Sequence, residues 1–180
     1  MNDIRHLLTV RGHRDYGREA VSQLEHALQC ASFAEEANES TSTVVAALLH
    51  DLGHLIAGEY QSDLSDHDDR DDLHQYVALP FLKGVFPESV LAPIRMHVDA
   101  KRFLCGIEVG YWDKLSPASK ESLALQGGPY SEAEARTFLR RDFALEAIRL
   151  RRYDDQSKVP QKRTASLDYF LDRTRTVLLL

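Results

Sequence analysis

The adjacent pair His50-Asp51 is the first place in the sequence that indicates chemistry. It follows the nearly continuous apolar run 44–49, so the Asp51 carboxylate is expected to be at least partly buried. A buried charge must be neutralised, and a divalent or trivalent metal ion does this well. Imidazole and carboxylate ligands suit iron, manganese or zinc, whereas a structural zinc site would use thiolates. The pair therefore predicts a metal site.

A site for two metal ions needs more ligands than one pair supplies, and the sequence offers them in order along the chain. The further candidates lie on other predicted helices: His26, His74, His97 and Asp154. Each neutral imidazole fills one coordination position, while the two oxygens of Asp51 allow this residue to bridge two ions. The alternative is a set of satisfied core or surface histidines, a chance His-Asp dipeptide and a polar helix end. The order and spacing of the whole set favour the metal site.

Apolar residues at helical spacing run through almost the whole chain, and these helices must position the ligands. One helix is expected over 17–38, and a second from Thr41 or Ser42 through Leu52. The acidic stretch 59–72 is expected to be a solvated loop. Because no convincing alternating strand pattern occurs, the sequence predicts an all-α fold.

Prolines and capping residues mark the helix boundaries in the second half of the chain. A helix that begins at His74 should be kinked or shortened by Pro80. Pro87 suits the first turn of the helix that carries His97, although Pro93 disturbs that helix. Two more helices are expected, one from Ser116 to the glycine pair 127–128 and one from the capping box Ser131/Glu134 through Leu150.

Length, composition and charge bound the class of protein. The 180 residues suit one domain, 1–180, and 43% hydrophobic with 28% charged residues is typical of globular proteins. The net charge of −6 argues against a nucleic-acid partner. No apolar segment approaches the roughly 18 residues that span a bilayer. Segment 1–16 has no signal-peptide core. Cys30 and Cys105 are not spaced as a redox pair. We expect a cytoplasmic protein without a membrane partner, and the oligomeric state is left open.

Three segments resemble a known family: 23–29, 46–54 and 97–102. They resemble the HD-domain superfamily and, within it, the mixed-valent diiron oxygenases of organophosphonate catabolism (PhnZ/TmpB-type), which are distantly related to myo-inositol oxygenase. Residues 115–129 and 153–154 continue the similarity, so that it covers most of the chain. The resemblance implies a single HD-domain helical bundle.

The resemblance also implies a cofactor, two iron ions in a mixed-valent Fe(II)/Fe(III) state, with O2 as co-substrate. One iron would be held by His26, His50, Asp51 and Asp154, and the other by Asp51, His74 and His97. The implied reaction cleaves the carbon–phosphorus bond of a 1-hydroxyphosphonate without an external reductant. In that reaction C1 loses a hydrogen before phosphate is released.

Polar residues are spaced so that they lie next to the predicted ligands. His54 follows His50 by four residues and Lys101 follows His97 by four, so each pair is expected to share a helical face. The alternative for Lys101 is a solvent-exposed lysine. The resemblance assigns phosphonate binding to His54, Lys101, Ser119 and Gln126.

Tyr16 and Glu19 precede His26, and Glu19 faces the same way as His26 if the helix begins early enough. The resemblance implies that Tyr16 can occupy the second iron until substrate displaces it. It also implies that Glu19 recognises the amino end of the substrate. The alternatives are a surface tyrosine and a helix-start carboxylate favoured by the helix dipole.

The expected substrate is a (R)-1-hydroxy-2-ammonioethylphosphonate, as the primary amine, which gives glycine, or the trimethylated form, which gives glycine betaine. The acidic stretch, dense in aspartate over 63–72, slightly favours the trimethylated form, with solvated charge as its alternative. Tyr60, Tyr76 and Trp112 are candidate aromatic partners for such a cation. Two hypotheses compete: an HD-type metal-dependent phosphohydrolase, in which a metal-bound hydroxide attacks phosphate, and a non-catalytic binding module, which has no need of all six ligands.

Overall fold

The computed structural model describes residues 1–57 and 73–179, and within these ranges it contains helices and no strand. The predicted all-α fold is confirmed. The acidic stretch 59–72, and Tyr60 with it, lies outside the described residues. The helices are α1 (Asn2–Val10), α2 (Gln23–Glu36), α3 (Thr41–Leu49), α4 (Leu52–Ala57), α5 (His74–Val77), α6 (Leu79–Leu82), α7 (Glu88–Ile107), α8 (Tyr111–Lys114), α9 (Pro117–Leu125), α10 (Glu132–Leu139), α11 (Ala144–Gln156) and α12 (Leu167–Arg175).

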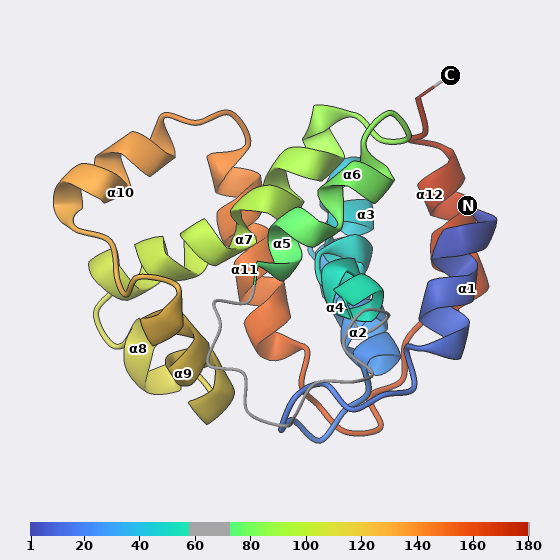
Figure 1. Ribbon diagram of the computed structural model, residues 1–180, viewed down its shortest axis with the longest axis horizontal. Coiled ribbons are helices and arrows are strands. Elements are labelled where there is room, and N and C mark those ends of the chain that lie inside the picture. Colours follow the sequence, from blue (N-terminus) through green and yellow to red (C-terminus); the bar gives the residue numbers. More distant parts are fainter. Residues whose placement is uncertain (58–72, 180) are drawn as a thin grey trace.

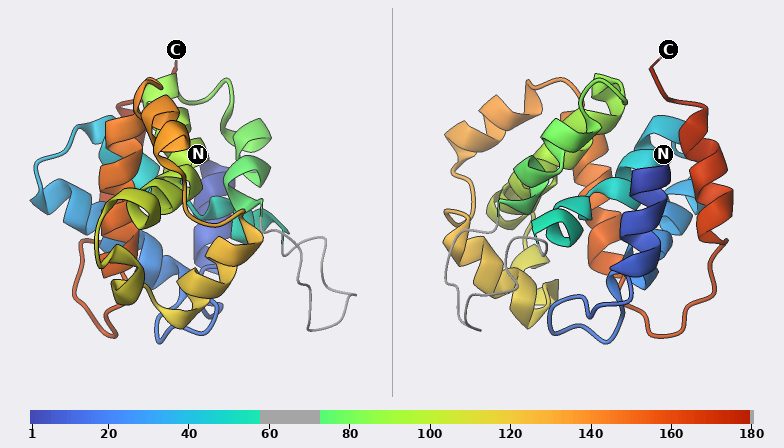
Figure 2. Two further views of the ribbon diagram at one scale, coloured as in Figure 1. Left: turned by 90° about the vertical axis from the view of Figure 1, so that its left-hand side faces the viewer. Right: turned by 45° about the vertical axis from the view of Figure 1, so that its right-hand side comes forward.

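Four helices, α2, α3, α7 and α11, form the centre of the molecule (Figure 1). α7 packs along α11 and against α3, and α2 packs against both α3 and α11. The helices α8, α9 and α10 lie at one end of this group, and α1 and α12 lie at the other (Figures 1 and 2). An ion pair between Arg5 and Asp168 joins α1 to α12. The four central helices carry most of the residues that the sequence singled out.

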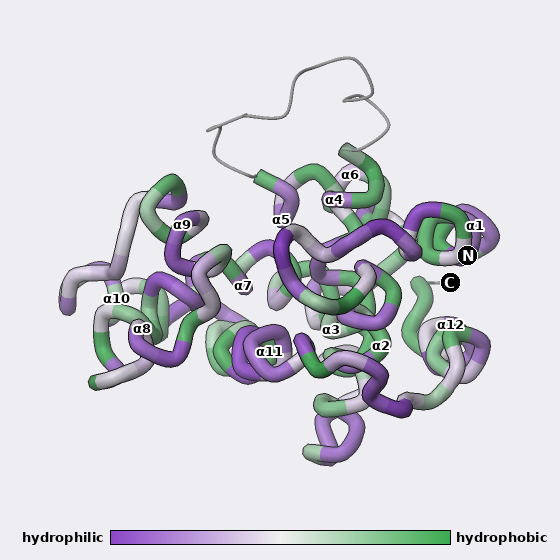
Figure 3. The backbone as a smooth tube through the Cα atoms, turned by 90° about the horizontal axis from the view of Figure 1, so that it is seen from below, coloured by the Kyte–Doolittle hydropathy of each residue, from purple (hydrophilic) through white to green (hydrophobic). Residues whose placement is uncertain are grey.

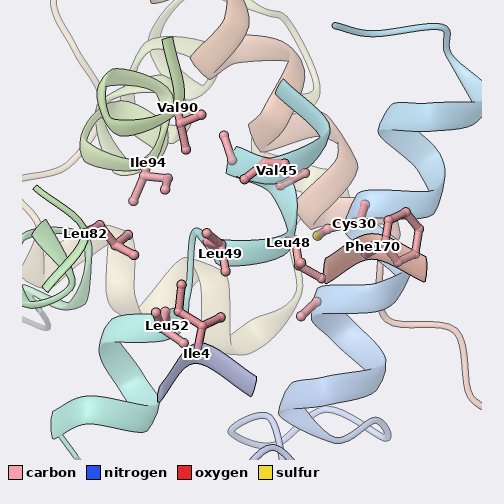
Figure 4. Packing of buried hydrophobic residues seen from close by; sticks show 14 of the residues in the cluster. Ile4, Cys30, Val45, Leu48, Leu49, Leu52, Leu82, Val90, Ile94 and Phe170 are labelled. Carbon is pink, nitrogen blue, oxygen red and sulfur yellow. The ribbon is translucent and has the colours of Figure 1, made fainter. Parts of the chain in front are cut away.

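α3 is the most thoroughly buried helix of the centre, and its residues 43–49 are all buried. Figure 3 shows hydrophobic residues gathered on it, whereas the outer helices mix hydrophobic and hydrophilic residues. A helix that is apolar on every face belongs in a core. In Figure 4 its side chains meet residues from four other helices: Val45, Leu48 and Leu49 lie among Val90, Ile94, Cys30, Phe170 and Leu82. The pair His50-Asp51, which follows α3, therefore lies in the interior of the protein.

The helix that carries His26 is shorter than the periodicity of 17–38 predicts. α2 begins at Gln23, because Ser22 caps it: the Ser22 side chain accepts from the Glu25 N–H, and the Glu25 carboxylate accepts from the Ser22 N–H. Glu19 precedes the helix. The condition under which Glu19 and His26 would share a helical face, an early start of the helix, is therefore not met.

The helix predicted to run from Thr41 or Ser42 through Leu52 is interrupted after Leu49. Ser40 caps α3, and His50 and Asp51 lie between α3 and α4. Neighbouring residues of a continuous helix point about 100° apart, yet His50 Nε2 lies 3.2 Å from Asp51 Oδ2. The interruption lets both side chains face one space, and the expectation that His50 and His54 share a helix is wrong.

The proline signals are confirmed in part. Pro80 lies in the first turn of α6, which is separated from α5, and Pro87 is the N-cap of α7. Pro93 lies inside α7 without interrupting it, so the expected disturbance does not occur. The predicted helix after Ser116 is α9, and Gln126 caps its C-terminal end.

The helix predicted from Ser131 through Leu150 is two helices. The capping box of Ser131 and Glu134 opens α10, as predicted, but α10 ends at Leu139. Phe143 then adopts a left-handed backbone conformation, with φ 64°, and serves as the N-cap of α11. A bulky residue rarely takes this conformation, and neither glycine nor proline marks the break. No helix among the described residues is both long and apolar enough to cross a membrane.

Gly53 fixes the distance between α4 and α5. An added Cβ at this position would lie 2.0 Å from the carbonyl oxygen of His74. We predict that Gly53→Ala lowers the free energy of unfolding by about 1–3 kcal/mol, because α5 must move away to make room. Chemical denaturation measures this change. Ala57→Ser, which adds one atom at the end of α4, is the matched control, and equal stability of both variants would contradict the prediction.

Candidate functional site

Asp51 is the residue around which the other candidate ligands gather, and its two carboxylate oxygens face different groups. On one side, Asp51 Oδ2 lies 3.2 Å from His50 Nε2 and 3.5 Å from His26 Nε2. On the other side, Asp51 Oδ1 lies 3.2 Å from His74 Nε2 and 3.7 Å from His97 Nε2. The side chain separates two clusters of imidazoles, as a bridging carboxylate would.

Asp154 of α11 completes the first cluster. Its Oδ1 lies 3.5 Å from His26 Nε2, and its Oδ2 accepts a hydrogen bond of 2.5 Å from Arg151. Asp154 Oδ1 and Asp51 Oδ2 are both buried, and neither has a hydrogen-bond partner among the described residues. Buried carboxylate oxygens without partners are costly. Their placement around one imidazole nitrogen fits a metal ion.

The histidine ring nitrogens support the same fit. The Nδ1 atoms of His26, His50 and His97 lie 2.7–2.9 Å from the backbone carbonyl oxygens of Ser157, Ala47 and Ile94. Each Nδ1–H therefore donates to a carbonyl, which leaves the Nε2 lone pair directed into the centre. The Nε2 atoms of His26 and His50 are only 3.3 Å apart. Two lone pairs face each other at this distance, an arrangement that a cation between them would stabilise.

The second cluster is equally tight, since His74 Nε2 lies 2.8 Å from His97 Nε2. Burial, followed by the neighbouring His74 and His50, holds the pKa of His97 well below its usual value. Burial likewise lowers the pKa of His26 to about 4. Both imidazoles are therefore neutral at pH 7, the form that binds metal ions.

The two carboxylates are ionised although both are buried. Burial alone would raise the pKa of Asp51, but His50 and His74 beside it hold that pKa well below its usual value. For Asp154, burial is likewise outweighed, chiefly by Arg151. Two negative charges, together with the neutral imidazoles of His26 and His97, make the donor set one that suits cations such as iron or manganese.

Cys30 lies closer to the centre than its interpretation as a core residue indicates. It is fully buried, as expected, and its Sγ lies 3.7 Å from His26 Nε2, so that it groups with His26 and His50. Burial raises the pKa of its thiol well above the usual value. The negative charge of this cluster is therefore supplied by the carboxylates, and Cys30 packs beside them as a neutral thiol.

A pocket of about 230 Å³ opens beside the two clusters. The residues that the resemblance assigned to substrate line it, as does Tyr16: Glu19, His54, Lys101, Ser119 and Gln126. The candidate aromatic partners Tyr76 and Trp112 are not among its described lining residues. The ring of His54 stacks on His74 with centroids 4.1 Å apart, and the ring of Tyr16 stacks on His26 at 3.8 Å. Burial, followed by the nearby carboxylates of Asp154 and Asp51, raises the pKa of the Tyr16 hydroxyl well above its usual value. The pocket therefore adjoins both clusters.

The described part of the wall carries three lysine and arginine side chains beside three carboxylates, and two of these three cations were not predicted from the sequence. Lys101 of α7 is buried and donates to Ser122 at 2.7 Å. Arg151 and Lys158 line the same pocket. Arg151 had one signal, since it precedes Asp154 by three residues on α11 and donates to it. Lys158 lies beyond the end of α11, where helical spacing carries no information.

An all-helical fold with a His-Asp pair at its buried centre defines the class of protein, and residues 23–119 match the HD domain family. The chain belongs to this family. It is 40% identical over 151 residues to hydroxymethylphosphonate dioxygenase from Gimesia maris, covering 81% of this chain and 74% of that protein. It is 34% identical over 160 residues to [1-hydroxy-2-(trimethylamino)ethyl]phosphonate dioxygenase (glycine-betaine-forming) from Leisingera caerulea, covering 89% and 81%. The predicted membership in this phosphonate-oxidising branch is confirmed.

Metal content tests the bridging position of Asp51. We predict that Asp51→Ala loses both metal ions, because each cluster loses its shared carboxylate and retains neutral imidazoles. Asp99→Ala removes a carboxylate on α7 that pairs with Tyr130 and Arg141 instead, and it should retain both ions. Elemental analysis after purification from iron-supplemented cells measures the difference. Two ions per chain in Asp51→Ala would contradict the assignment.

The pH dependence of stability tests the burial of Lys101. Burial, with Arg151 nearby, lowers the pKa of Lys101 from 10.5 to about 7 in the folded protein. The folded state therefore disfavours the ammonium form, and this destabilisation is complete below pH 7 and fades as the pH rises toward 10.5. We predict that Lys101→Met is more stable than the natural protein at pH 6.5, and that denaturant titrations show the advantage shrinking by pH 9.5. A constant difference would refute the burial of the charge.

Proposed function

We propose that this protein catalyses the O2-dependent oxidative cleavage of the carbon–phosphorus bond of a 1-hydroxyphosphonate. The observation that carries the proposal is the division of candidate ligands on either side of Asp51, next to a pocket that Lys101, Arg151 and Lys158 line. Kinship with two proteins named as phosphonate dioxygenases supports the same chemistry. In the reaction the C1–P bond breaks, C1 becomes a carboxylate and phosphorus leaves as phosphate. O2 accepts four electrons and its two atoms enter the two products, so no external reductant is needed.

The proposed cofactor is a pair of iron ions in a mixed-valent Fe(II)/Fe(III) state, which would supply the reduction of O2. His26, His50, Asp51 and Asp154 would hold one ion, and Asp51, His74 and His97 the other. The donor set fits, because it consists of imidazole and carboxylate with open space on the pocket side. Tyr16, whose ring stacks on His26, would occupy the second ion and leave it when substrate binds.

The phosphonate is proposed to bind to His54, Lys101, Ser119 and Gln126. Lys101 is the strongest of these donors when protonated, because a buried ammonium close to a dianion is little screened by water. Ser119 lies at the same end of the pocket and receives a hydrogen bond from Arg151 at 3.4 Å. These side chains would orient C1 toward the iron pair, with Glu19 near the far end of the substrate.

We further expect a protein of one domain that acts in the cytoplasm on a small molecule. Its free cysteines, Cys30 and Cys105, suit a reducing compartment. The net charge of −6 opposes nucleic-acid binding, while lysine and arginine side chains in the pocket wall can still bind a small anionic substrate.

Phosphate release in the presence and absence of O2 tests the proposal. We predict that the iron-loaded protein releases phosphate from hydroxymethylphosphonate or a longer 1-hydroxyphosphonate in air, with consumption of one O2 per phosphate. Without O2 the release should fall to the rate of buffer alone. A phosphohydrolase would need no O2, so undiminished anaerobic release would overturn the proposal.

A further inference from the structure

Arg102 follows Lys101 on α7, but the two side chains line different cavities. Lys101 lines the pocket beside the candidate metal centre. Arg102 lines a separate cleft between α7 and α10, together with Tyr130 and Phe138. Neighbouring residues of a helix point about 100° apart, so one helix can present these two cations to two cavities. Arg102 is thus outside the wall of the pocket.

The guanidinium group of Arg102 binds the chain just beyond α9. Its Nε donates to the carbonyl of Gly128 at 2.8 Å, and a terminal nitrogen donates to the carbonyl of Gly127 at 3.0 Å. The N–H groups of a guanidinium form a rigid fork, so two such contacts fix orientation as well as distance. Gln126, which caps α9 and lines the pocket, directly precedes these two glycines. Arg102 therefore holds the backbone next to Gln126.

Further contacts fix the same stretch, residues 127–130, to α7. The Tyr130 N–H donates to the carbonyl of Arg102 at 3.0 Å, and the Tyr130 hydroxyl donates to Asp99 at 2.7 Å. The guanidinium also lies over the Tyr130 ring, 4.4 Å from its centroid. An added Cβ at Gly106 would lie 2.1 Å from the Tyr130 carbonyl oxygen, so this close approach requires glycine. The stretch 127–130 is therefore docked along one helix.

α9 depends on such contacts because it packs little against the central helices. It lies at one end of the molecule (Figures 1 and 2), and no other described helix packs extensively against it. Only Ser119 and Leu123 of its residues are buried. A second polar contact joins α9 to α7, since Lys101 donates to Ser122 at 2.7 Å. Two consecutive residues of α7 thus help to place α9.

The side chain of Gln126 depends on its backbone for its position. Its Oε1 atom is buried without a hydrogen-bond partner among the described residues. A buried amide oxygen without a partner is costly, and an amide group offers both donors and an acceptor to a ligand. Because no contact at Oε1 holds the amide in the pocket, its location follows from that of the chain at the end of α9.

We propose that Arg102 is a positioning residue for Gln126. By binding the two carbonyls after Gln126, it holds the end of α9 against α7 and places the Gln126 amide where the phosphonate binds. This inference rests on the proposed function, in which Gln126 binds the phosphonate, and it adds a residue from outside the pocket. The alternative is a purely structural role, in which Arg102 stabilises the fold without affecting substrate binding.

Arg102→Lys tests the inference, because lysine keeps the charge and loses the fork of donors. The probe is whichever of hydroxymethylphosphonate, 1-hydroxy-2-aminoethylphosphonate and its trimethylammonio form the iron-loaded natural protein converts fastest. We expect KM to rise about tenfold with kcat within about twofold, since a hydrogen bond made on binding is lost. Calorimetric titration of the iron-loaded protein without O2 should show Kd weakened by a similar factor.

Arg141→Lys is the matched control. Arg141 lines the same cleft as Arg102, but it pairs with Asp99 and not with the chain after α9. This variant should leave KM and Kd unchanged. A purely structural role of Arg102 predicts a lower temperature of thermal unfolding in Arg102→Lys with an unchanged Kd, and that result would refute the inference.

A double-mutant cycle shows whether Arg102 acts through Gln126. In a protein that already carries Gln126→Ala, Arg102→Lys should change Kd by less than about twofold, because the group to be positioned is gone. Losses that multiply would contradict the inference. If Arg102→Lys does not fold, Gly106→Ala displaces the same stretch through the Tyr130 carbonyl, and it should weaken Kd in the natural background alone.

The natural protein separates this inference from the proposed function. Absence of O2-dependent phosphate release from all three compounds would refute the proposed function and the role of Arg102 with it. Release by the natural protein, together with an unchanged Kd in Arg102→Lys, would refute the role of Arg102 and leave the proposed function standing.

Discussion

The burial of the Asp51 carboxylate is the constraint on which the rest of the structure depends. A charge at the end of the most apolar helix is stable only if other elements bring compensating groups to it. α2, α5, α7 and α11 do so from four directions, and each contributes a residue near Asp51 or near its neighbour His26. The packing of the central helices and the geometry of the candidate centre therefore have one cause.

The gathering of the candidate ligands at one centre could be predicted from the sequence, because the prediction depended on the types of the residues and on their order along the chain. The local geometry could not be predicted so well. The interruption at His50-Asp51 follows a run of residues with strong helical periodicity. The break before α11 occurs at Phe143, and no glycine or proline near this residue indicates a helix end. In both places tertiary contacts override helix propensity.

The substrate side of the pocket was harder to predict for a different reason. His54, Lys101, Ser119 and Gln126 lie in the pocket wall, although His54 reaches it from α4 and not from a helix shared with His50. Lys158 reaches the wall from an irregular segment after α11. Its partner Glu19 comes from another irregular segment, before α2. Spacing within one helix cannot indicate a contact between two segments that lie 139 residues apart.

The segment 157–159 links the candidate metal centre to the pocket wall, because consecutive residues of this segment contact the two. The carbonyl of Ser157 accepts a hydrogen bond from the ring of His26 at the centre, and the next residue along the chain carries the ammonium that pairs with Glu19 in the pocket wall. Insertions or deletions there, the usual way in which loops diversify, would disturb the imidazole as well as the lysine. An exchange of the Lys158 side chain on an unchanged backbone would instead alter the pocket wall and leave the hydrogen bond between Ser157 and His26 in place.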